Sequence, residues 1–197
     1  NGMVFEFVSR EKYRNKTSEE FQKELKKKFG DFYLIPEGGT NDFAVKGCEE
    51  ILTEEDSKFD YICSAVGTGG TISGLINSVN SDQKVIGFPA LKGNFLQVEI
   101  EKFTAKENWQ LQTNYHFGGY AKYNIELIRF INNFKIETGI LLDPIYTGKM
   151  VFGILDLIAK NTLKSGTKIL AIHTGGIQGI TGFNQKLKKK QQETIHI

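Results

Sequence analysis

Apolar and polar positions along the chain form short blocks that predict strands and helices in turn. Tyr61–Val66 is a mostly apolar run of β-forming residues, and Ile72, Leu75, Ile76 and Val79 then repeat at the spacing of one helix face. Strands that alternate with helices favour an α/β fold. We expect a three-layer structure in which helices cover both faces of a mainly parallel sheet.

The same patterns predict the remaining elements. Thr17 or Ser18 is suited to begin a helix that Gly30 would end. Strands are predicted at residues 4–8, 32–35, 85–88 and 168–173 with an extended segment at 109–115, and further helices at 45–52, 94–103, 123–134 and 150–163.

Composition and charge narrow the class of protein. The 197 residues are 40% hydrophobic and 24% charged, which is typical of a globular protein of one to one and a half domains. The net charge of +2 and the absence of a long apolar run predict neither a nucleic acid nor a membrane as partner. Cys48 and Cys63 are isolated, so we expect reduced thiols in a cytoplasmic protein, and neither they nor the three histidines form a metal motif.

The turn between the predicted strand and helix is rich in glycine and threonine. It consists of Gly67, Thr68, Gly69, Gly70 and Thr71. Glycines allow a ligand to approach the backbone, and a helix N-terminus offers free N–H groups to an anion. An ordinary turn is the alternative, but the composition exceeds what a turn needs and indicates a phosphate site.

The spacing of this turn excludes two common phosphate motifs. No lysine follows the glycines as in a P-loop, and Ile72 stands where a dinucleotide-binding motif has its third glycine. The phosphate monoester of a cofactor remains, and pyridoxal phosphate fits best. Similar turns at 36–41, 143–148 and 174–176 are expected to converge with this one, because ligands collect at the carboxyl ends of parallel strands.

Four motifs in order resemble one enzyme family. The segments AVGTGGTISGL (65–75), IPEGGTN (35–41), LLDPIYTGKM (141–150) and IHTGG (172–176) resemble 1-aminocyclopropane-1-carboxylate deaminases and D-cysteine desulfhydrases. The resemblance implies the fold-type II of pyridoxal-phosphate enzymes, that of the tryptophan-synthase β-subunit, and a homodimer. It divides the chain into a remnant of the smaller domain (1–35), the larger cofactor-binding domain (36–187) and a polar tail (188–197).

The chain departs from the family at its front. Family members carry a preceding segment with the lysine that bonds the cofactor and a Ser-Asn-His motif for the substrate carboxylate, and neither is found in this sequence. We therefore interpret the chain as the C-terminal part of a longer enzyme, truncated at the N-terminus. Lys149 lies close to the expected site and is the alternative candidate for that lysine.

The resemblance also assigns residue roles. It implies that residues 67–71 hold the cofactor phosphate, and that Tyr120 and Tyr146 lie near the substrate as catalytic tyrosines. Deaminases have glutamate at the position of Thr147 and tend to have leucine at that of Thr174. Threonine at both positions, expected near the ring nitrogen of the cofactor, is the desulfhydrase-like pattern.

The sequence leaves three functions open. The favoured one is α,β-elimination of D-cysteine to pyruvate, ammonia and sulfide, because a thiolate is a good leaving group and neutral hydroxyls can then suffice beside the ring. Deamination of 1-aminocyclopropane-1-carboxylate is the alternative within the same chemistry. A non-catalytic fragment that only binds a phosphate compound is the alternative of another class.

Overall fold

The computed structural model describes residues 2–197, which divide into two compact units, one ending at Ile35 and the other spanning Pro36–Ile197. In the first unit, α1 (Arg10–Arg14) and α2 (Glu19–Phe29) begin at serines whose hydroxyls accept backbone N–H groups, and Gly30 ends α2 as the pattern predicted. Within residues 2–197, no helix is both long and apolar enough to cross a bilayer.

The strands predicted at 4–8 and 32–35 are wrong for this structure, because both segments are irregular. Their large apolar side chains are exposed, as for Val4 at 93% and Phe7 at 90%. A strand is stabilised by hydrogen bonds to a neighbouring strand, and no other segment of the first unit, as far as the structure describes it, pairs with them. Apolar composition alone therefore did not produce a strand here.

The second unit is built on a four-stranded parallel sheet of order β3-β2-β1-β4. Its strands are β1 (Tyr61–Val66), β2 (Lys84–Pro89), β3 (Trp109–Leu111) and β4 (Ile169–Ile172). The helices are α3 (Asp42–Cys48), α4 (Gly70–Ser78), α5 (Phe95–Glu101), α6 (Ile125–Thr138), α7 (Thr147–Ala159) and α8 (Ile180–Lys189). Short 3₁₀ turns lie at Glu37–Gly39, Glu54–Lys58, Thr113–Tyr115 and Ile177–Gly179.

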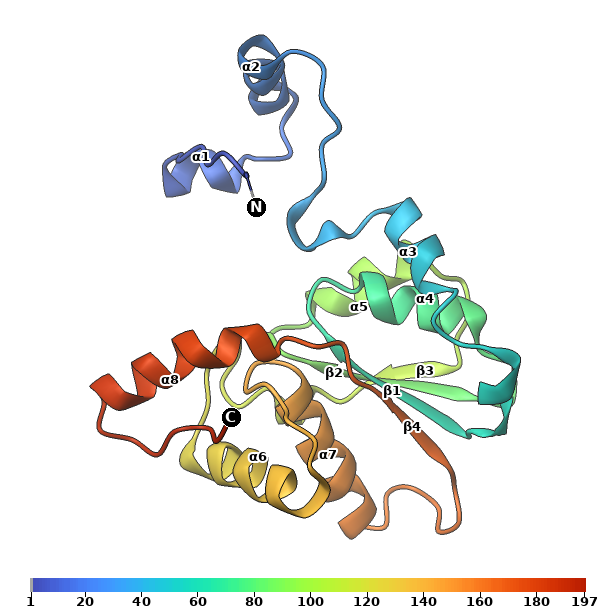
Figure 1. Cartoon of the computed structure of the whole chain (residues 1–197). Helices are drawn as coiled ribbons and strands as arrows, with labels where there is room; N and C mark the ends of the chain where they lie inside the picture. The colour runs from blue at the N-terminus through green and yellow to red at the C-terminus, as the bar shows by residue number, and fades with distance from the viewer. Residues whose placement is uncertain (1) are drawn as a thin grey trace. The chain divides into compact units, whose positions relative to one another are not determined.

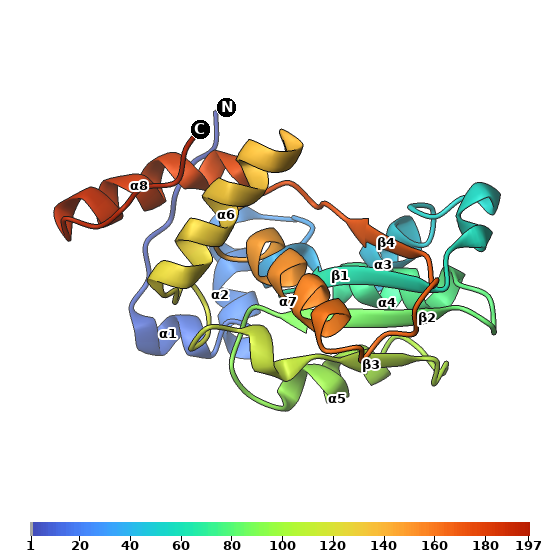
Figure 2. The same cartoon turned by 90° about the horizontal axis from the view of Figure 1, so that it is seen from below.

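Alternate side chains of β1 reach opposite faces of the sheet and create the layers. Ile62 and Val66 pack with apolar residues of α4 and α5, whereas Cys63 and Ala65 pack with those of α7. Figures 1 and 2 show α4 and α5 along one face and α7 along the other. The predicted three-layer α/β fold is thereby confirmed for the second unit.

A third apolar cluster joins α6, α8 and the end of the chain. The segment 188–197, predicted as a polar tail, contains Ile195, which is buried against this cluster. The Asn184 side chain accepts the N–H of Ile195 at 2.9 Å and donates to its carbonyl at 2.8 Å. Asn132 of α6 binds the same tail, since it donates to the carbonyl of Thr194 and accepts the N–H of His196. One apolar side chain and two asparagines therefore hold the tail against α6 and α8.

Candidate functional site

The four glycine-rich turns converge on one cavity of about 840 Å³. The turn at 67–71 follows the carboxyl end of β1, and the turn at 174–176 follows that of β4. The residues lining the cavity include Glu37, Gly38, Gly39, Thr40, Cys48, Gly67, Thr68, Gly69, Gly70, Thr71, Tyr120, Tyr146, Thr174, Gly175 and Gly176. The convergence that the sequence predicted for separate turns is confirmed.

The turn from β1 into α4 has the backbone geometry of an anion site. Gly69 is the N-cap residue of α4 with a φ of 99°, and a Cβ built there would lie 3.1 Å from Cγ1 of Ile100. Glycine contributes no side chain to cap the helix, so the first-turn N–H groups keep no partner from that position. Together with the hydroxyls of Thr68 and Thr71, which also line the cavity, these groups can hold a phosphate.

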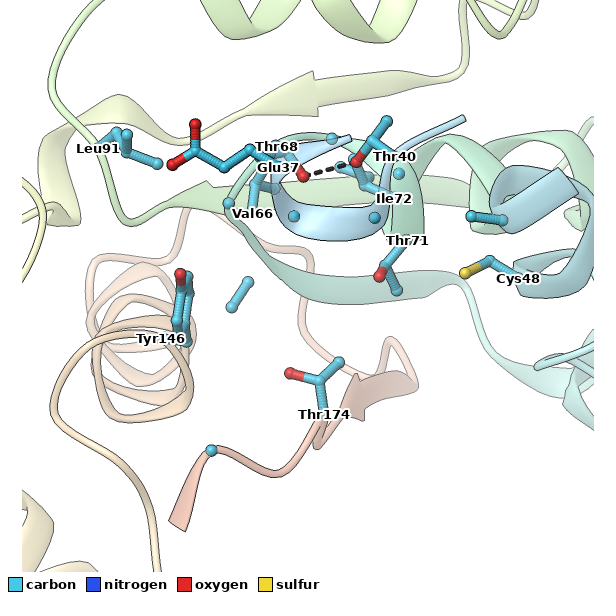
Figure 3. Close-up of a pocket in the computed structure, with 18 of the residues that line it drawn as sticks. Glu37, Thr40, Cys48, Val66, Thr68, Thr71, Ile72, Leu91, Tyr146 and Thr174 are labelled. Atoms are coloured by element: carbon cyan, nitrogen blue, oxygen red, sulfur yellow. Dashed lines mark hydrogen bonds between the residues drawn. The ribbon is translucent and has the colours of Figure 1, made fainter. Parts of the chain in front are cut away.

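A second glycine-rich turn packs directly on the first. The hydroxyls of Thr40 and Thr68 are 2.6 Å apart, and Figure 3 shows them joined at one side of the cavity. A Cβ at Gly38 would lie 2.6 Å from Cγ2 of Thr68, and one at Gly70 would lie 2.9 Å from Oγ1 of Thr40. Both glycines are therefore required for the two turns to meet.

Two tyrosines form another wall of the cavity. The rings of Tyr120 and Tyr146 meet edge to face with centroids 6.2 Å apart. A Cβ at Gly67 would lie 3.4 Å from Cε1 of Tyr146, so the phenol approaches the phosphate turn closely. Burial, and secondarily the neighbouring Tyr120, raises the pKa of Tyr146 to about 12. The Tyr146 phenol therefore keeps its proton at neutral pH and can donate it.

A buried carboxylate sets the position of Tyr146. Asp143 Oδ1 accepts the N–H groups of Ile145 and Tyr146 at 2.8 and 2.9 Å, and Oδ2 accepts the N–H of Thr147 at 2.8 Å. Asp143 is only 2% exposed and sits at the start of α7, where negative charge is favoured. This cap also explains why α7 begins at Thr147, three residues before the predicted helix.

The two diagnostic threonines lie in different surroundings. Thr174 lines the cavity on the side opposite Thr40 (Figure 3), whereas Thr147 is fully buried and its hydroxyl donates to Asp143 Oδ2 at 2.6 Å. The turn that carries Thr174 nevertheless approaches the partner of Thr147, because a Cβ at Gly176 would lie 3.1 Å from Cγ of Asp143. Thus every predicted site residue except Thr147 lines the cavity, and Thr147 lies behind it.

The sequence predicted that the turns at 36–41 and 143–148 reach the site but did not single out three polar residues within them. Glu37 and Thr40 line the cavity, and Asp143 supports Tyr146 from behind. An Asp-Pro pair just ahead of a helix is a recognisable capping signal for Asp143. No comparable signal marks Thr40, because its contact with Thr68 joins turns 28 residues apart.

The residues present fit a phosphate-bearing cofactor. The crowded glycines would not tolerate a Cβ, and they leave backbone groups accessible beside threonine hydroxyls. The cavity volume is within the usual range for small-molecule sites, roughly 300–1,000 Å³. Lys149 does not line this cavity, and its ammonium donates instead to two backbone carbonyls.

Comparisons with known proteins find similar sequences. No family model matches the chain. The chain is 37% identical to a Pyrococcus horikoshii protein named "Putative 1-aminocyclopropane-1-carboxylate deaminase", over 87% of this chain and 58% of that protein. It is 33% identical to the Arabidopsis thaliana protein named "Bifunctional D-cysteine desulfhydrase/1-aminocyclopropane-1-carboxylate deaminase, mitochondrial", over 91% of this chain and 51% of that protein.

A solved structure gives the same result for the fold. The chain superposes on a crystal structure of an ACC deaminase homologue with a TM-score of 0.74 and 31% identity, covering 95% of this chain and 62% of the other. The chain therefore spans little more than half the length of the relatives that it matches.

Proposed function

This chain is a homologue of the 1-aminocyclopropane-1-carboxylate deaminases and D-cysteine desulfhydrases, and on that premise we propose that the natural protein containing it is a pyridoxal-phosphate-dependent enzyme acting on a small amino acid. Its preferred reaction is α,β-elimination of D-cysteine. The α C–H bond and the β C–S bond break, and water completes the conversion to pyruvate, ammonia and sulfide. When bound, the cofactor withdraws electrons from the α-carbon through its ring.

The glycine-rich turn provides the phosphate end of the proposed site. Gly67, Gly69 and Gly70 let the backbone approach the phosphate, and Thr68 and Thr71 add hydroxyl donors. A hydrogen bond from a backbone N–H to a charged oxygen contributes about 1.5–3 kcal/mol, so several of them support tight retention. Thr40 orients the Thr68 hydroxyl through their short contact and belongs to the same group.

The opposite end of the cavity supports the ring and the substrate. We assign Thr174 to the surroundings of the ring nitrogen, with Thr147 and its partner Asp143 immediately behind. Tyr120 and Tyr146 face the substrate. Because Tyr146 is protonated at neutral pH, its phenol Oη is suited to donate a hydrogen bond to the departing sulfur rather than to remove a proton from carbon.

The observation that carries the choice of D-cysteine is the neutral, hydroxyl-bearing pair at positions 147 and 174. Position 147 carries no carboxylate of its own, and the carboxylate of Asp143 behind it is occupied by the Thr147 hydroxyl and by backbone N–H groups. A weakly stabilised ring nitrogen suffices when the leaving group is a thiolate. The relative with 33% identity is named for both activities, so its name is compatible with D-cysteine as a substrate but does not favour it over the cyclopropane.

Deamination of 1-aminocyclopropane-1-carboxylate is the second candidate. The name of the Pyrococcus horikoshii relative and the description of the superposed crystal structure favour it. Ring opening would give 2-oxobutanoate and ammonia, so the two activities have different products from different substrates.

The deciding experiment supplies each substrate to the purified natural protein after its pyridoxal phosphate content is measured by absorbance. Sulfide and pyruvate from D-cysteine, with little 2-oxobutanoate from the cyclopropane, would support the proposal. Efficient ring opening without sulfide release would establish the second candidate instead. Bound cofactor with neither product would leave a non-catalytic phosphate-binding protein. Light scattering on the same sample tests the expected homodimer.

A further inference from the structure

A buried lysine holds a loop at the edge of the cavity. Lys149 lies in the first turn of α7 and is only 1% exposed. Its Nζ donates to the backbone carbonyl of His116 at 2.8 Å and to that of Gly119 at 2.9 Å. Within residues 2–197, no carboxylate forms an ion pair with Lys149, so two neutral carbonyls are the acceptors of a buried ammonium.

The loop that receives this ammonium has an unusual backbone. Phe117, Gly118 and Gly119 have φ angles of 53°, 94° and 117°, so three consecutive residues are in the left-handed region. A non-glycine residue there is uncommon and needs support from its surroundings. The support comes from α7. The Phe117 ring packs edge to face on that of Phe152, with centroids 5.1 Å apart, and the Lys149 ammonium donates to the carbonyls of His116 and Gly119.

The residue that follows this loop is Tyr120, whose ring meets Tyr146 at 6.2 Å. Tyr120 is 55% exposed, so few side-chain contacts fix its position. Lys149 is three residues after Tyr146 on the same helix start. The N-terminus of α7 therefore affects both tyrosines. Tyr146 is its N-cap residue, and the ammonium of Lys149 binds the backbone directly before Tyr120.

We propose that Lys149 is a positioning residue for substrate binding and turnover: by gathering the carbonyls of His116 and Gly119, it fixes Tyr120 opposite Tyr146. This inference rests on the proposed function, in which both tyrosines face the substrate. The competing explanations are that Lys149 is only a structural contact of the unit's core, or that it is the lysine that bonds the cofactor.

The test compares Lys149→Met with Lys160→Met in the natural protein. Lys160 follows α7, and its side chain is 65% exposed and pairs with Asp156, which also accepts the hydroxyl of Tyr115. Lys160→Met therefore matches the chemical change while leaving the two carbonyl contacts of the loop in place. Hydrogen exchange of residues 116–120 reports the loop without requiring activity. We expect this exchange to accelerate at least about tenfold in Lys149→Met and to stay at the wild-type rate in Lys160→Met. Local opening of the loop must break the two Lys149 contacts in the wild type, and it no longer has to do so in Lys149→Met.

Turnover gives the readout that a purely structural role would not change. In Lys149→Met the bound cofactor should be retained while kcat falls by roughly tenfold or more, since a misplaced group about 1 Å away costs up to about a hundredfold. Adding Tyr120→Phe to Lys149→Met should then lower kcat by less than about threefold, although Tyr120→Phe alone lowers it about tenfold, because the two residues act as one unit.

Several results would overturn the inference. The first is an unchanged exchange rate at 116–120 in Lys149→Met. The second is a double variant in which the losses of kcat from Lys149→Met and Tyr120→Phe multiply. The third is loss of covalently bound cofactor in Lys149→Met. If Lys149→Met does not fold, Gly119→Ala retains the lysine and strains the same loop, since Gly119 has a φ of 117°. It should reproduce the faster exchange and the lower kcat, and a normal kcat would refute the role. A wild type that is inactive on both substrates refutes the proposed function, while the exchange data still decide whether Lys149 holds the loop.

Discussion

Asp143 and Thr147 are joined by hydrogen bonds in both directions. The Thr147 hydroxyl donates to Asp143 Oδ2 at 2.6 Å, and the Asp143 backbone N–H donates to the same hydroxyl at 2.9 Å. With the N–H groups that Asp143 also accepts, this pair closes the turn that delivers Tyr146 to the cavity. Thr147, on which the proposed choice of D-cysteine rests, is thus part of the support for Tyr146.

Asp143→Asn should destabilise the protein and misplace Tyr146. An amide cannot accept all of the hydrogen bonds that reach the two carboxylate oxygens, and it brings N–H groups toward other donors. We expect a loss of about 1.5–3 kcal/mol in the free energy of unfolding, measured by urea denaturation, because the lost bonds are to a charged group. Asp82→Asn, the same change at an exposed position, should change it by less than about 0.5 kcal/mol. Equal effects at both positions would contradict the capping role.

Gly69→Val should weaken pyridoxal phosphate binding more than it weakens folding. Valine strongly disfavours a φ of 99°, and its Cβ would crowd Ile100 at 3.1 Å beside the proposed phosphate donors. We expect the dissociation constant of the cofactor to rise at least about tenfold, with roughly 1–3 kcal/mol lost in stability. Gly182→Val in α8, where a Cβ meets nothing within 4 Å, is the control, and it should leave cofactor affinity unchanged. An ordered phosphate elsewhere in a crystal of the natural protein would count against the assignment of this turn.

The sequence predicted the glycine-rich turn after Tyr61–Val66 better than it predicted the contacts that hold the cavity walls in place. Tyr61–Val66 is buried by layers on both faces, so its apolar run and the glycines after it are local signals that survive in the fold. The contacts of Thr40 with Thr68 and of Lys149 with the loop at 116–119 join distant segments, and no local pattern reports them. Strand pairing is likewise not visible in a local pattern. Residues 4–8 are apolar enough for a strand, but within residues 2–197 no strand pairs with them.

Tyr146→Phe should lower turnover with little change in cofactor content. The ring and its packing remain and only the phenol hydroxyl is lost, so kcat should fall by about tenfold if its hydrogen bond stabilises the departing thiolate. Tyr115→Phe is the matched control, because burial also raises the pKa of Tyr115 to about 12 while its hydroxyl bonds Asp156 and does not line the cavity. Stopped assays of sulfide and pyruvate release on both variants provide the measurement. A normal kcat in Tyr146→Phe would remove the tyrosine from the chemistry.

The two cysteines should differ in reactivity toward a thiol reagent. Cys48 lines the cavity, whereas Cys63 is buried in β1 and its burial raises the pKa of the thiol to about 12. The natural protein and its Cys48→Ser variant should therefore differ by one fast-reacting thiol. Pyridoxal phosphate should slow the reaction of Cys48, because both occupy the same cavity. Labelling of Cys63 in the folded protein would contradict its burial. If pyridoxal phosphate did not change the labelling rate of Cys48, the proposed position of the cofactor in this cavity would be wrong.

The free energy of unfolding should depend on pH through the titration of Lys149. Burial lowers the pKa of this lysine from 10.5 to about 8, although Asp143 opposes the shift. Between these two values the unfolded chain binds one proton more than the folded chain, so the contribution of Lys149 to the free energy of unfolding increases as pH rises. Below pH 8 the ammonium is charged in both states and burial disfavours it fully. The neutral amine formed at higher pH still has two N–H donors, so both carbonyl contacts can remain. Wild type should therefore gain stability relative to Lys149→Met in urea titrations from about pH 7 to about pH 9.5. Cys63 opposes this trend in the wild type, but it is present in both proteins and cancels in the comparison. A difference that stays flat over this range would show that the lysine keeps an ordinary pKa.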